Sequence, residues 1–126
     1  MKSRWVEHKG IEIFYVDFSN LAVNQDRFGE ELEAVALTVE AQPEVSILGL
    51  VDLRNTLLSI AMTLIMKGYA QRMGRHIGKA AVVVNEANIA KKMLLNGIAR
   101  VGGREVTLFE NVEAAKEWLV GDKGSA

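Results

Sequence analysis

The sequence predicts one α/β domain with a mixed, mostly parallel sheet of about five strands and four helices. Two short, nearly continuous apolar runs, at residues 45–51 and 80–84, are typical of strands covered on both faces. Segments with apolar residues at i, i+3, i+4 and i+7 follow these runs, which is the spacing of an amphipathic helix. Strands that alternate with helices predict right-handed crossovers onto a parallel sheet.

The chain opens with a predicted β-hairpin. Residues 5–8 and 11–17 are rich in β-branched and aromatic side chains, and Lys9-Gly10 between them supplies a glycine for a tight reversal. The first strand is therefore antiparallel and lies at or near an edge of the sheet. A first helix is expected next, with Asn24 as its N-cap and Pro43 just beyond its end. Its inward face is predicted to consist of Phe28, Leu32, Val35, Ala36 and Val39.

The rest of the chain continues the alternation. A second helix is predicted at 57–73, and a third follows the strand at 80–84, with apolar residues between 89 and 98. The last strand is expected at 105–109, and Asn111 caps a fourth helix. The inward face of the second helix is predicted to be Leu57, Ile60, Ala61, Leu64, Ile65, Gly68 and Tyr69, and that of the fourth Ala114, Ala115, Trp118 and Leu119. We expect one domain over 1–120 and a flexible tail over 121–126.

Composition excludes several classes of protein. The 126 residues carry 15 Lys and Arg against 16 Asp and Glu, a net charge of −1, and no Cys. A near-neutral chain lacks the basic surface that nucleic-acid binding needs, so we expect no nucleic-acid partner. Without Cys there is no disulfide, thiolate nucleophile or Cys-type zinc site, and a reducing, cytoplasmic setting fits this composition. No uninterrupted apolar run approaches about 18 residues, so the sequence predicts no transmembrane helix.

Polar residues follow three of the predicted strands, at the sheet edge where ligands collect in parallel sheets. The members of this strand-end polar cluster are Asp17, Ser19, Asp52, Asn55, Asn85 and Glu86. Turn formation and helix capping explain such residues without any ligand. The alternative is an acidic Mg²⁺ pocket with Asp52 as phosphate acceptor, for which Asp17 stands without the usual second acid.

No catalytic or metal-binding template fits the sequence. His8 and His76 are far apart and have no partner at i+3 or i+4 spacing, and no G-x-S-x-G elbow surrounds a serine. We therefore predict a protein without enzymatic activity, metal or cofactor. Asp17, Asp52 and Glu86 are the acids that an enzyme would use.

With its apolar stripe on the sheet, the second helix would turn another row of residues outward, namely Met62, Thr63, Met66 and Ala70. Unbranched Met side chains adapt to apolar surfaces, so this row is predicted to bind a protein partner or a second copy of the chain, as a homodimer. The alternative is that the stripe is wide and the row belongs to the core. Ser59 and Thr56, near the helix start, are candidate phosphorylation sites, with N-capping as the alternative role.

Four stretches of the chain resemble a known family. They are 10–21, the strand end Leu50-Val51-Asp52, the strand Ala81-Val82-Val83-Val84, and 109–119. Together they are similar to the SpoIIAA-like branch of the STAS superfamily over nearly the whole chain. The resemblance implies a small α/β domain with about four helices around a mixed sheet, related also to the lipid-binding Sec14-type fold.

The resemblance also implies a function. In the anti-sigma-factor antagonists of this superfamily, a serine in a D-S-x-G-L stretch at a helix start is phosphorylated by a partner kinase, and the same helix contacts that partner. Ser59 falls near the matching place, although Leu58 replaces the preceding acid and Ile60-Ala61 replace the small residue and the glycine. We expect a non-enzymatic interaction module that acts through the second helix and its preceding loop. The alternative is a domain that binds a lipid or small apolar ligand in the Sec14 manner.

Overall fold

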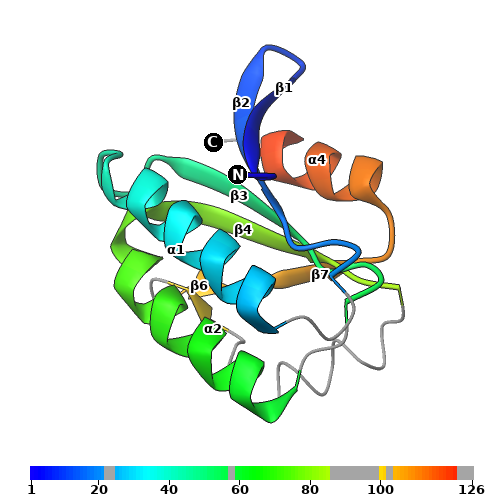
Figure 1. Cartoon of the computed structure of the whole chain (residues 1–126). Coiled ribbons are helices and arrows are strands. Elements are labelled where there is room, and N and C mark those ends of the chain that lie inside the picture. The colour runs from blue at the N-terminus through cyan, green and yellow to red at the C-terminus, as the bar shows by residue number, and fades with distance from the viewer. Residues whose placement is uncertain (22–24, 57–58, 86–99, 102–103, 122–126) are drawn as a thin grey trace.

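The structure of the chain, a computed structural model, describes most of its residues, in the ranges 1–21, 25–56, 59–85, 100–101 and 104–121. In these ranges a five-stranded mixed sheet carries helices on both faces, which confirms the predicted α/β class (Figure 1). Three α-helices are described, and the segment predicted to form another, 89–98, lies outside the described ranges. None of the described helices has the length and apolar character needed to cross a bilayer.

Two helices cover one face of the sheet and one helix covers the other. The helices α1 (Gln25–Glu40) and α2 (Ile60–Met73) lie side by side on the first face, and α4 (Val112–Gly121) lies on the second (Figure 1). Successive side chains of a strand point to opposite faces, so the central strands contribute to both halves of the core. The sheet is therefore buried on both sides, as its continuous apolar runs predict.

The opening hairpin forms as predicted, from β1 (Arg4–His8) and β2 (Ile11–Asp17), which pair antiparallel. Its two turn residues, Lys9 and Gly10, have φ angles of 53° and 80°. Positive φ at both central residues is what a type I′ turn requires, and the twist of that turn matches the twist of paired strands. The hairpin lies at the edge of the sheet, as expected.

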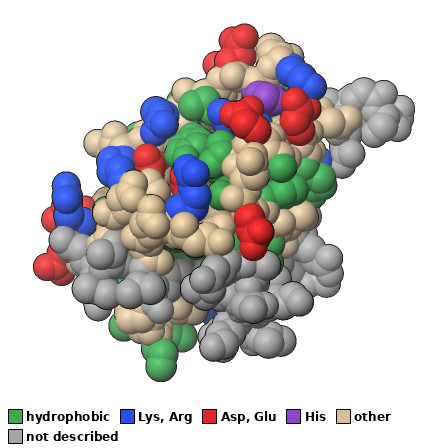
Figure 2. Space-filling model, turned by 90° about the vertical axis from the view of Figure 1, so that its right-hand side faces the viewer, with side chains coloured by type: hydrophobic (Ala, Val, Ile, Leu, Met, Phe, Trp, Pro, Cys, Tyr) green, Lys and Arg blue, Asp and Glu red, His purple; other side chains and the backbone are tan. Residues whose placement is uncertain are grey.

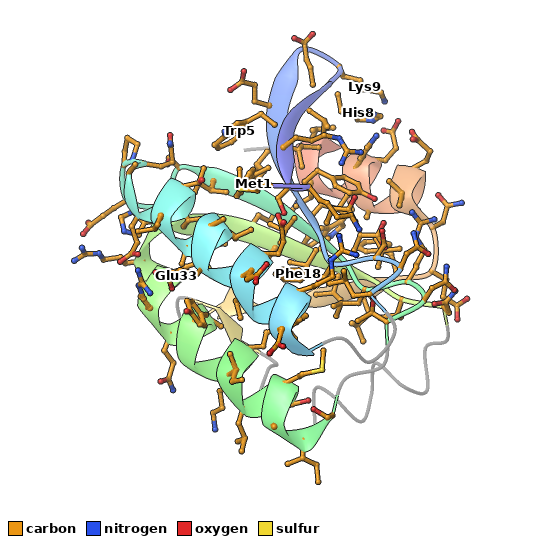
Figure 3. The ribbon with its side chains drawn as sticks, in the orientation of Figure 1. Met1, Trp5, His8, Lys9, Phe18 and Glu33 are labelled. Carbon is orange, nitrogen blue, oxygen red and sulfur yellow. The ribbon has the colours of Figure 1, made fainter. Side chains whose placement is uncertain are left out.

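The turn of the hairpin is fixed to α4. Glu117 of α4 accepts a hydrogen bond from Lys9 Nζ at 2.6 Å and lies 3.2 Å from His8 Nε2. Figure 3 shows His8 and Lys9 together at the end of the hairpin beside α4. The contacts join positions that are 108 and 109 residues apart in the chain.

Three further strands extend the sheet in parallel. They are β3 (Ile47–Asp52), β4 (Ile77–Val83) and β7 (Thr107–Phe109), and the strand order is β1-β2-β3-β4-β7. The mostly parallel sheet with an antiparallel edge strand is thus confirmed. The register places Asp17 opposite Asp52, at the carboxyl ends of β2 and β3.

The last predicted strand, at 105–109, is interrupted. Its first residue belongs to β6 (Arg104–Glu105), which pairs with β5 (Arg100–Val101) in a separate two-stranded ribbon. Val106 is buried in the half of the core that lies under α1 and α2, and β7 begins only after it. The prediction of one continuous strand is therefore wrong, because the segment forms two short strands that pair with different neighbours, β6 with β5 and β7 with β4.

The predicted inward face of α1 is confirmed. Its five members, from Phe28 to Val39, are each at most 1% exposed. The aromatic ring of Phe28 packs against Phe18, which follows β2, with ring centroids 4.8 Å apart. Asn24, the predicted N-cap, lies outside the described residues.

The predicted inward face of α4 is confirmed in part. Ala115 and Leu119 are fully buried, and Asn111 caps the helix because its Oδ1 accepts a hydrogen bond from Ala114 N at 3.0 Å. Ala114 itself is exposed, since the helical turn that buries Ala115 directs its neighbour outward. Gly121, expected in the tail, is the last residue of α4, and 122–126 lie outside the described residues.

The rotation of α2 about its axis is opposite to the prediction. Ile60 and Leu64, assigned to the inside, are 83% and 63% exposed. Met62 and Met66, assigned to the outside, are 1% and 7% exposed. Ala70 is buried with them. The helix ends at Met73 and passes into a 3₁₀ turn, close to the predicted boundary.

Contacts with α1 set this rotation. The hydroxyl of Tyr69 donates to Glu33 of α1, and Arg72 reaches both Glu33 at 3.2 Å and Glu40 at 2.6 Å. Figure 3 shows Glu33 on the side of α1 that faces α2. Periodicity alone could not choose the rotation, because α2 carries two apolar stripes and no acidic residue.

Candidate functional site

The predicted strand-end polar residues lie together at the carboxyl edge of the sheet. The Asn55 side-chain amide donates to Asn20 Oδ1 at 3.0 Å, and Asn55 N donates to Asn85 Oδ1 at 2.6 Å. Asn20 in turn donates to Ser19 Oγ at 3.4 Å. These bonds connect the exits of β2, β3 and β4. Glu86, the remaining predicted member, lies outside the described residues.

The exits of β2 and β3 have the same turn. In each, the aspartate Oδ1 accepts a hydrogen bond from the backbone N–H two residues later, at 3.0 Å after Asp17 and 3.1 Å after Asp52. An asparagine with positive φ follows, Asn20 at 60° and Asn55 at 59°. Asparagine tolerates this conformation better than most residues. The repeated spacing Asp-x-x-Asn in the sequence is a signal of this shared turn.

Asp52 is fully buried at the end of β3. Its Oδ1 accepts hydrogen bonds from Arg54 N at 3.1 Å and Arg54 Nε at 2.9 Å. Its Oδ2 accepts from Arg54 Nη2 at 2.7 Å and from the hydroxyl of Tyr15. Four donors therefore occupy the carboxylate, which has no free oxygen for Mg²⁺, phosphate or a proton from a substrate. The arrangement does not support the alternative of a phosphate acceptor at Asp52.

The buried cluster of Tyr15, Asp52 and Arg54 shifts the proton affinities of its members. Burial acts to raise the pKa of Asp52, but the hydrogen bonds from Arg54 and Tyr15 hold it below its ordinary value. Burial, together with the bond to Asp52, raises the pKa of Tyr15 to about 12. The pKa of Arg54 is raised by Asp52. The cluster is thus held as a carboxylate, a neutral phenol and a guanidinium at neutral pH.

These shifts predict a pH dependence of stability. The pKa of Tyr15 rises from 10.0 to about 12 on folding, so its contribution is complete below pH 10 and is lost as the pH rises through about 12. A shift of this size corresponds to roughly 3 kcal/mol. The pKa of Asp52 is lowered on folding, so the contribution of Asp52 to stability is complete above its ordinary pKa of 3.8. This contribution is lost as the pH falls below that value. Urea denaturation between pH 3 and 11 measures both losses.

The control for this prediction is Tyr15→Phe, which keeps the ring and removes the titrating hydroxyl. We expect this variant to be less stable by about 1 kcal/mol at neutral pH, because Asp52 loses one donor. Its stability should fall less than that of the wild type between pH 9 and 11. An equal alkaline loss in both proteins would contradict the assignment to Tyr15.

Asp17, at the end of β2, is bound by the first residues of the chain. Its Oδ1 accepts from Ser19 N at 3.0 Å and Ser19 Oγ at 2.5 Å, and its carboxylate pairs with Lys2 at 3.6 Å and Arg4 at 3.4 Å. Burial acts to raise its pKa, but Ser19 and these cations hold the pKa below its ordinary value. Figure 2, which faces the side of the molecule at the right of Figure 1, shows acidic and basic side chains interspersed. The described part of this face therefore offers no field of a single sign to an ionic ligand.

The two candidate phosphorylation sites differ in accessibility. Thr56 Oγ1 donates to Phe18 O at 2.5 Å and accepts from Leu21 N at 3.0 Å, so Thr56 holds the exits of β2 and β3 together. Phosphorylation of Thr56 would remove the proton that it donates to Phe18 O. Ser59 is exposed and is the N-cap of α2, because its Oγ accepts from Met62 N at 3.1 Å. Of the two, Ser59 is the hydroxyl that a kinase can reach.

The predicted partner-binding row on α2 does not lie on the surface. Met62, Met66 and Ala70 pack in the core under α1 and α2, and Thr63 is half-buried with its hydroxyl bonded to Ser59 O at 3.0 Å. The prediction that this row contacts a partner is therefore wrong. The alternative placed the row in the core, which is correct for the methionines, but the stripe is not wide, because Ile60 and Leu64 are exposed.

A different row of α2 is exposed. This outer face of α2 consists of Ile60, Ala61, Leu64, Ile65 and Gly68. A shallow groove of about 320 Å³ adjoins it, lined by Leu64, Ile65, Gly68, Tyr69 and Arg72. Among the described residues, no atom outside its own helix backbone and chain neighbours lies within 4 Å of the place that a Cβ on Gly68 would take. The outer face combines an apolar surface with a shallow, open depression.

Sequence reasoning missed two kinds of residue. Tyr15 completes the cluster around Asp52, and the signal available for it was its position in a strand next to an acid-ended strand. Leu64 and Ile65 were assigned to the core because their spacing is helical. No local pattern could show that the opposite stripe is the one that packs.

The described residues contain no group of three or more His, Asp or Glu side chains that could hold a metal ion. In the same part of the chain, every buried polar side-chain atom has a hydrogen-bond partner. The described members of the strand-end polar cluster thus form a hydrogen-bonded junction between three strand exits, and the outer face of α2 is the better candidate for a binding site.

Comparison of the chain with protein-family models, with curated proteins and with solved structures finds no match.

Proposed function

We propose that this protein is a non-enzymatic interaction module of STAS type, which binds a protein partner through the outer face of α2. The observation that carries the proposal is the exposure of a row of large apolar side chains on one helix. Ile60 is 83%, Leu64 63% and Ile65 36% exposed. Single exposed apolar residues are common, but several on adjacent turns of one helix form a patch of the kind that partners cover.

The shape of this surface favours a helical partner. Ile65, Gly68, Tyr69 and Arg72 stand at i, i+3, i+4 and i+7, which is the arrangement that receives a side chain of a facing helix. Gly68, one of these four residues, has no side chain that could extend into the hole. Arg72 at its rim is held by Glu33 and Glu40, so the wall of the hole is fixed before a partner arrives. A large apolar side chain of the partner would fill it.

Ser59 supplies a means of regulation at one end of the same face. Phosphorylation would add a charge of about −1.5 to −2 directly before Ile60. This charge favours the N-terminus of α2 but opposes the burial of the neighbouring apolar residues in an interface. We therefore propose that phosphorylated Ser59 releases the partner.

Site-specific photo-crosslinking tests the proposal. A benzophenone amino acid at Leu64, in cells that make the protein, is expected to give an adduct of one defined mass. The same amino acid at Glu113, which is exposed on α4 at the other face of the sheet, should give none. Ile60→Asp and Ile65→Asp should remove the adduct, because a charge at the interface opposes its burial. Similar adducts from both positions, or none from Leu64, would reject the outer face as a docking surface.

Two matched variants of Ser59 test the proposed regulation. Ser59→Asp and Ser59→Asn both keep a good N-cap, but only the first adds a charge. We expect Ser59→Asp to reduce the yield of the adduct at least fivefold and Ser59→Asn to leave it nearly unchanged. Equal yields from the two variants would reject the switch while leaving the docking surface intact. An adduct of twice the chain mass would identify the partner as a second copy.

The alternative expected from the sequence, a lipid binder in the Sec14 manner, is less well supported. The cavity between the sheet and the helices α1 and α2 has a volume of about 90 Å³. Pockets for ligands of ordinary size occupy roughly 300–1,000 Å³. A phospholipid would therefore need α1 or α2 to leave the sheet, and the bonds of Tyr69 and Arg72 to α1 oppose such a movement.

A further inference from the structure

An apolar cavity lies between the sheet and the helices α1 and α2, on the inner side of α2. Its volume is about 90 Å³, and the described residues that line it are all apolar. The sheet contributes Gly49 and Ala80, α1 contributes Val35, and α2 contributes Met66 and Ala70. The cavity is thus separate from the outer face of α2, and it belongs to neither the strand-end polar cluster nor the groove beside Gly68.

Small residues create this space. Gly49 of β3 lies opposite Ala80 of β4 and opposite Phe14 of β2, on the face that α1 and α2 cover. A Cβ added to Gly49 would meet nothing nearer than Lys79 O at 4.0 Å. The backbone therefore leaves room for a larger side chain that the sequence does not supply. Close-packed interiors hold few voids larger than a water molecule, so a void of this size is unusual.

The lining decides what can occupy the cavity. A buried water needs 2–4 polar partners, and the lining side chains offer none. A ligand with a hydroxyl or carboxyl group inside the cavity would lose its hydrogen bonds to water without replacement. An apolar cavity of roughly 150 Å³ in another protein stays dry and binds benzene or xenon. The present cavity is smaller but has the same chemistry.

We propose that this cavity is a binding site for a small, wholly apolar molecule of the size of benzene or below. Two of its walls are adaptable, because Met66 and Met73 have unbranched side chains that change rotamer easily. The site selects against polar molecules of the same size, since it cannot satisfy them. This inference does not rest on the docking surface of α2.

Methionine-methyl NMR with benzene as the probe tests the site. Benzene is expected to give saturable shifts at Met66 and Met73, which line the cavity, and smaller shifts at Met62, which is buried but does not line it. Phenol, which adds one hydroxyl, should bind at least tenfold more weakly. Pressurised xenon should perturb the same two methyl groups. The absence of saturable shifts with benzene, or equal binding of phenol, would overturn the proposal.

Variants at Gly49 locate the bound probe. Gly49→Val fills the space and is expected to abolish benzene binding. Gly49→Ala adds one methyl group and should raise the Kd for benzene at least threefold. It is the variant to measure if Gly49→Val does not fold. Gly29→Ala, on α1, adds a methyl group where nothing lies within 4 Å and should leave the Kd unchanged. An unchanged Kd in Gly49→Ala would place benzene elsewhere and reject the cavity as its site.

Discussion

Replacing Arg54 with methionine is expected to lower the free energy of unfolding by about 3 kcal/mol at neutral pH. Arg54 gives two side-chain hydrogen bonds to Asp52, whose carboxylate is fully buried. Without the guanidinium, a charge remains in apolar surroundings with only Tyr15 and one backbone N–H as donors. Removing one partner of a buried ion pair costs roughly 3–5 kcal/mol for this reason, and the lower end applies here because the Arg54 side chain is 41% exposed. Urea denaturation followed by circular dichroism measures the loss.

Arg4→Met is the matched control, because Arg4 also pairs with an aspartate but is mostly exposed. Its effect should stay below about 1 kcal/mol, as for other surface ion pairs. Adding Asp52→Asn to Arg54→Met should recover part of the lost stability, since the unpaired charge is then gone. Equal losses in the two arginine variants would show that the buried cluster contributes no more than a surface pair.

Met66→Asp is expected to destabilise the protein by about 4 kcal/mol or to prevent folding, whereas Leu64→Asp should change the free energy of unfolding by less than about 1 kcal/mol. The two positions lie two residues apart on α2, so the loss of helix propensity is the same. Met66 is 7% exposed and Leu64 is 63% exposed. Only the first substitution places a charge in the core. Thermal and urea denaturation measure both variants.

Met62→Asp provides an independent repeat, because Met62 is 1% exposed. It should behave like Met66→Asp. The rotation of α2 expected from the sequence gives the reverse order of effects, with the larger loss for Leu64→Asp. That reverse order, or equal losses, would contradict the packing described for α2 and with it the outer face as a docking surface.

The elements that the sequence predicts well are those whose local and tertiary requirements agree. The hairpin has a glycine at a turn position with φ of 80°, and α1 has one apolar stripe with charged residues on its other faces. Each pattern allows one arrangement only. The last strand was predicted less well, because its first residue pairs in a separate ribbon with β5 while 107–109 pair with β4.

The rotation of α2 shows what a local pattern cannot decide. Both stripes of the helix are apolar, and the choice between them follows from Tyr69 and Arg72, which bond to Glu33 and Glu40 of α1. Each acid precedes the α2 residue that bonds to it by more than thirty positions in the chain. The misassigned methionines and the missed outer face therefore have one cause, which lies in tertiary contacts.

The strand-end polar cluster was predicted from topology, since parallel strands bring their carboxyl ends to one edge. The sequence did not reveal that Asp52 would be sealed by Tyr15 and Arg54. Tyr15 sits two positions before Asp17 and so shares its face of the sheet, but its bond to Asp52 depends on the register between β2 and β3. Register is a property of the assembled sheet.

The bond between the hairpin turn and α4 has a consequence for synthesis of the chain. α4 alone, among the described helices, covers the sheet face that contains Ile13, Leu50 and Val83, and Glu117 follows Lys9 by 108 residues. The ribosome must therefore release nearly all of the chain from β1 to α4 before α4 can bury that face of the sheet. Until then the nascent sheet exposes a broad apolar surface to which chaperones, or other nascent copies, can attach.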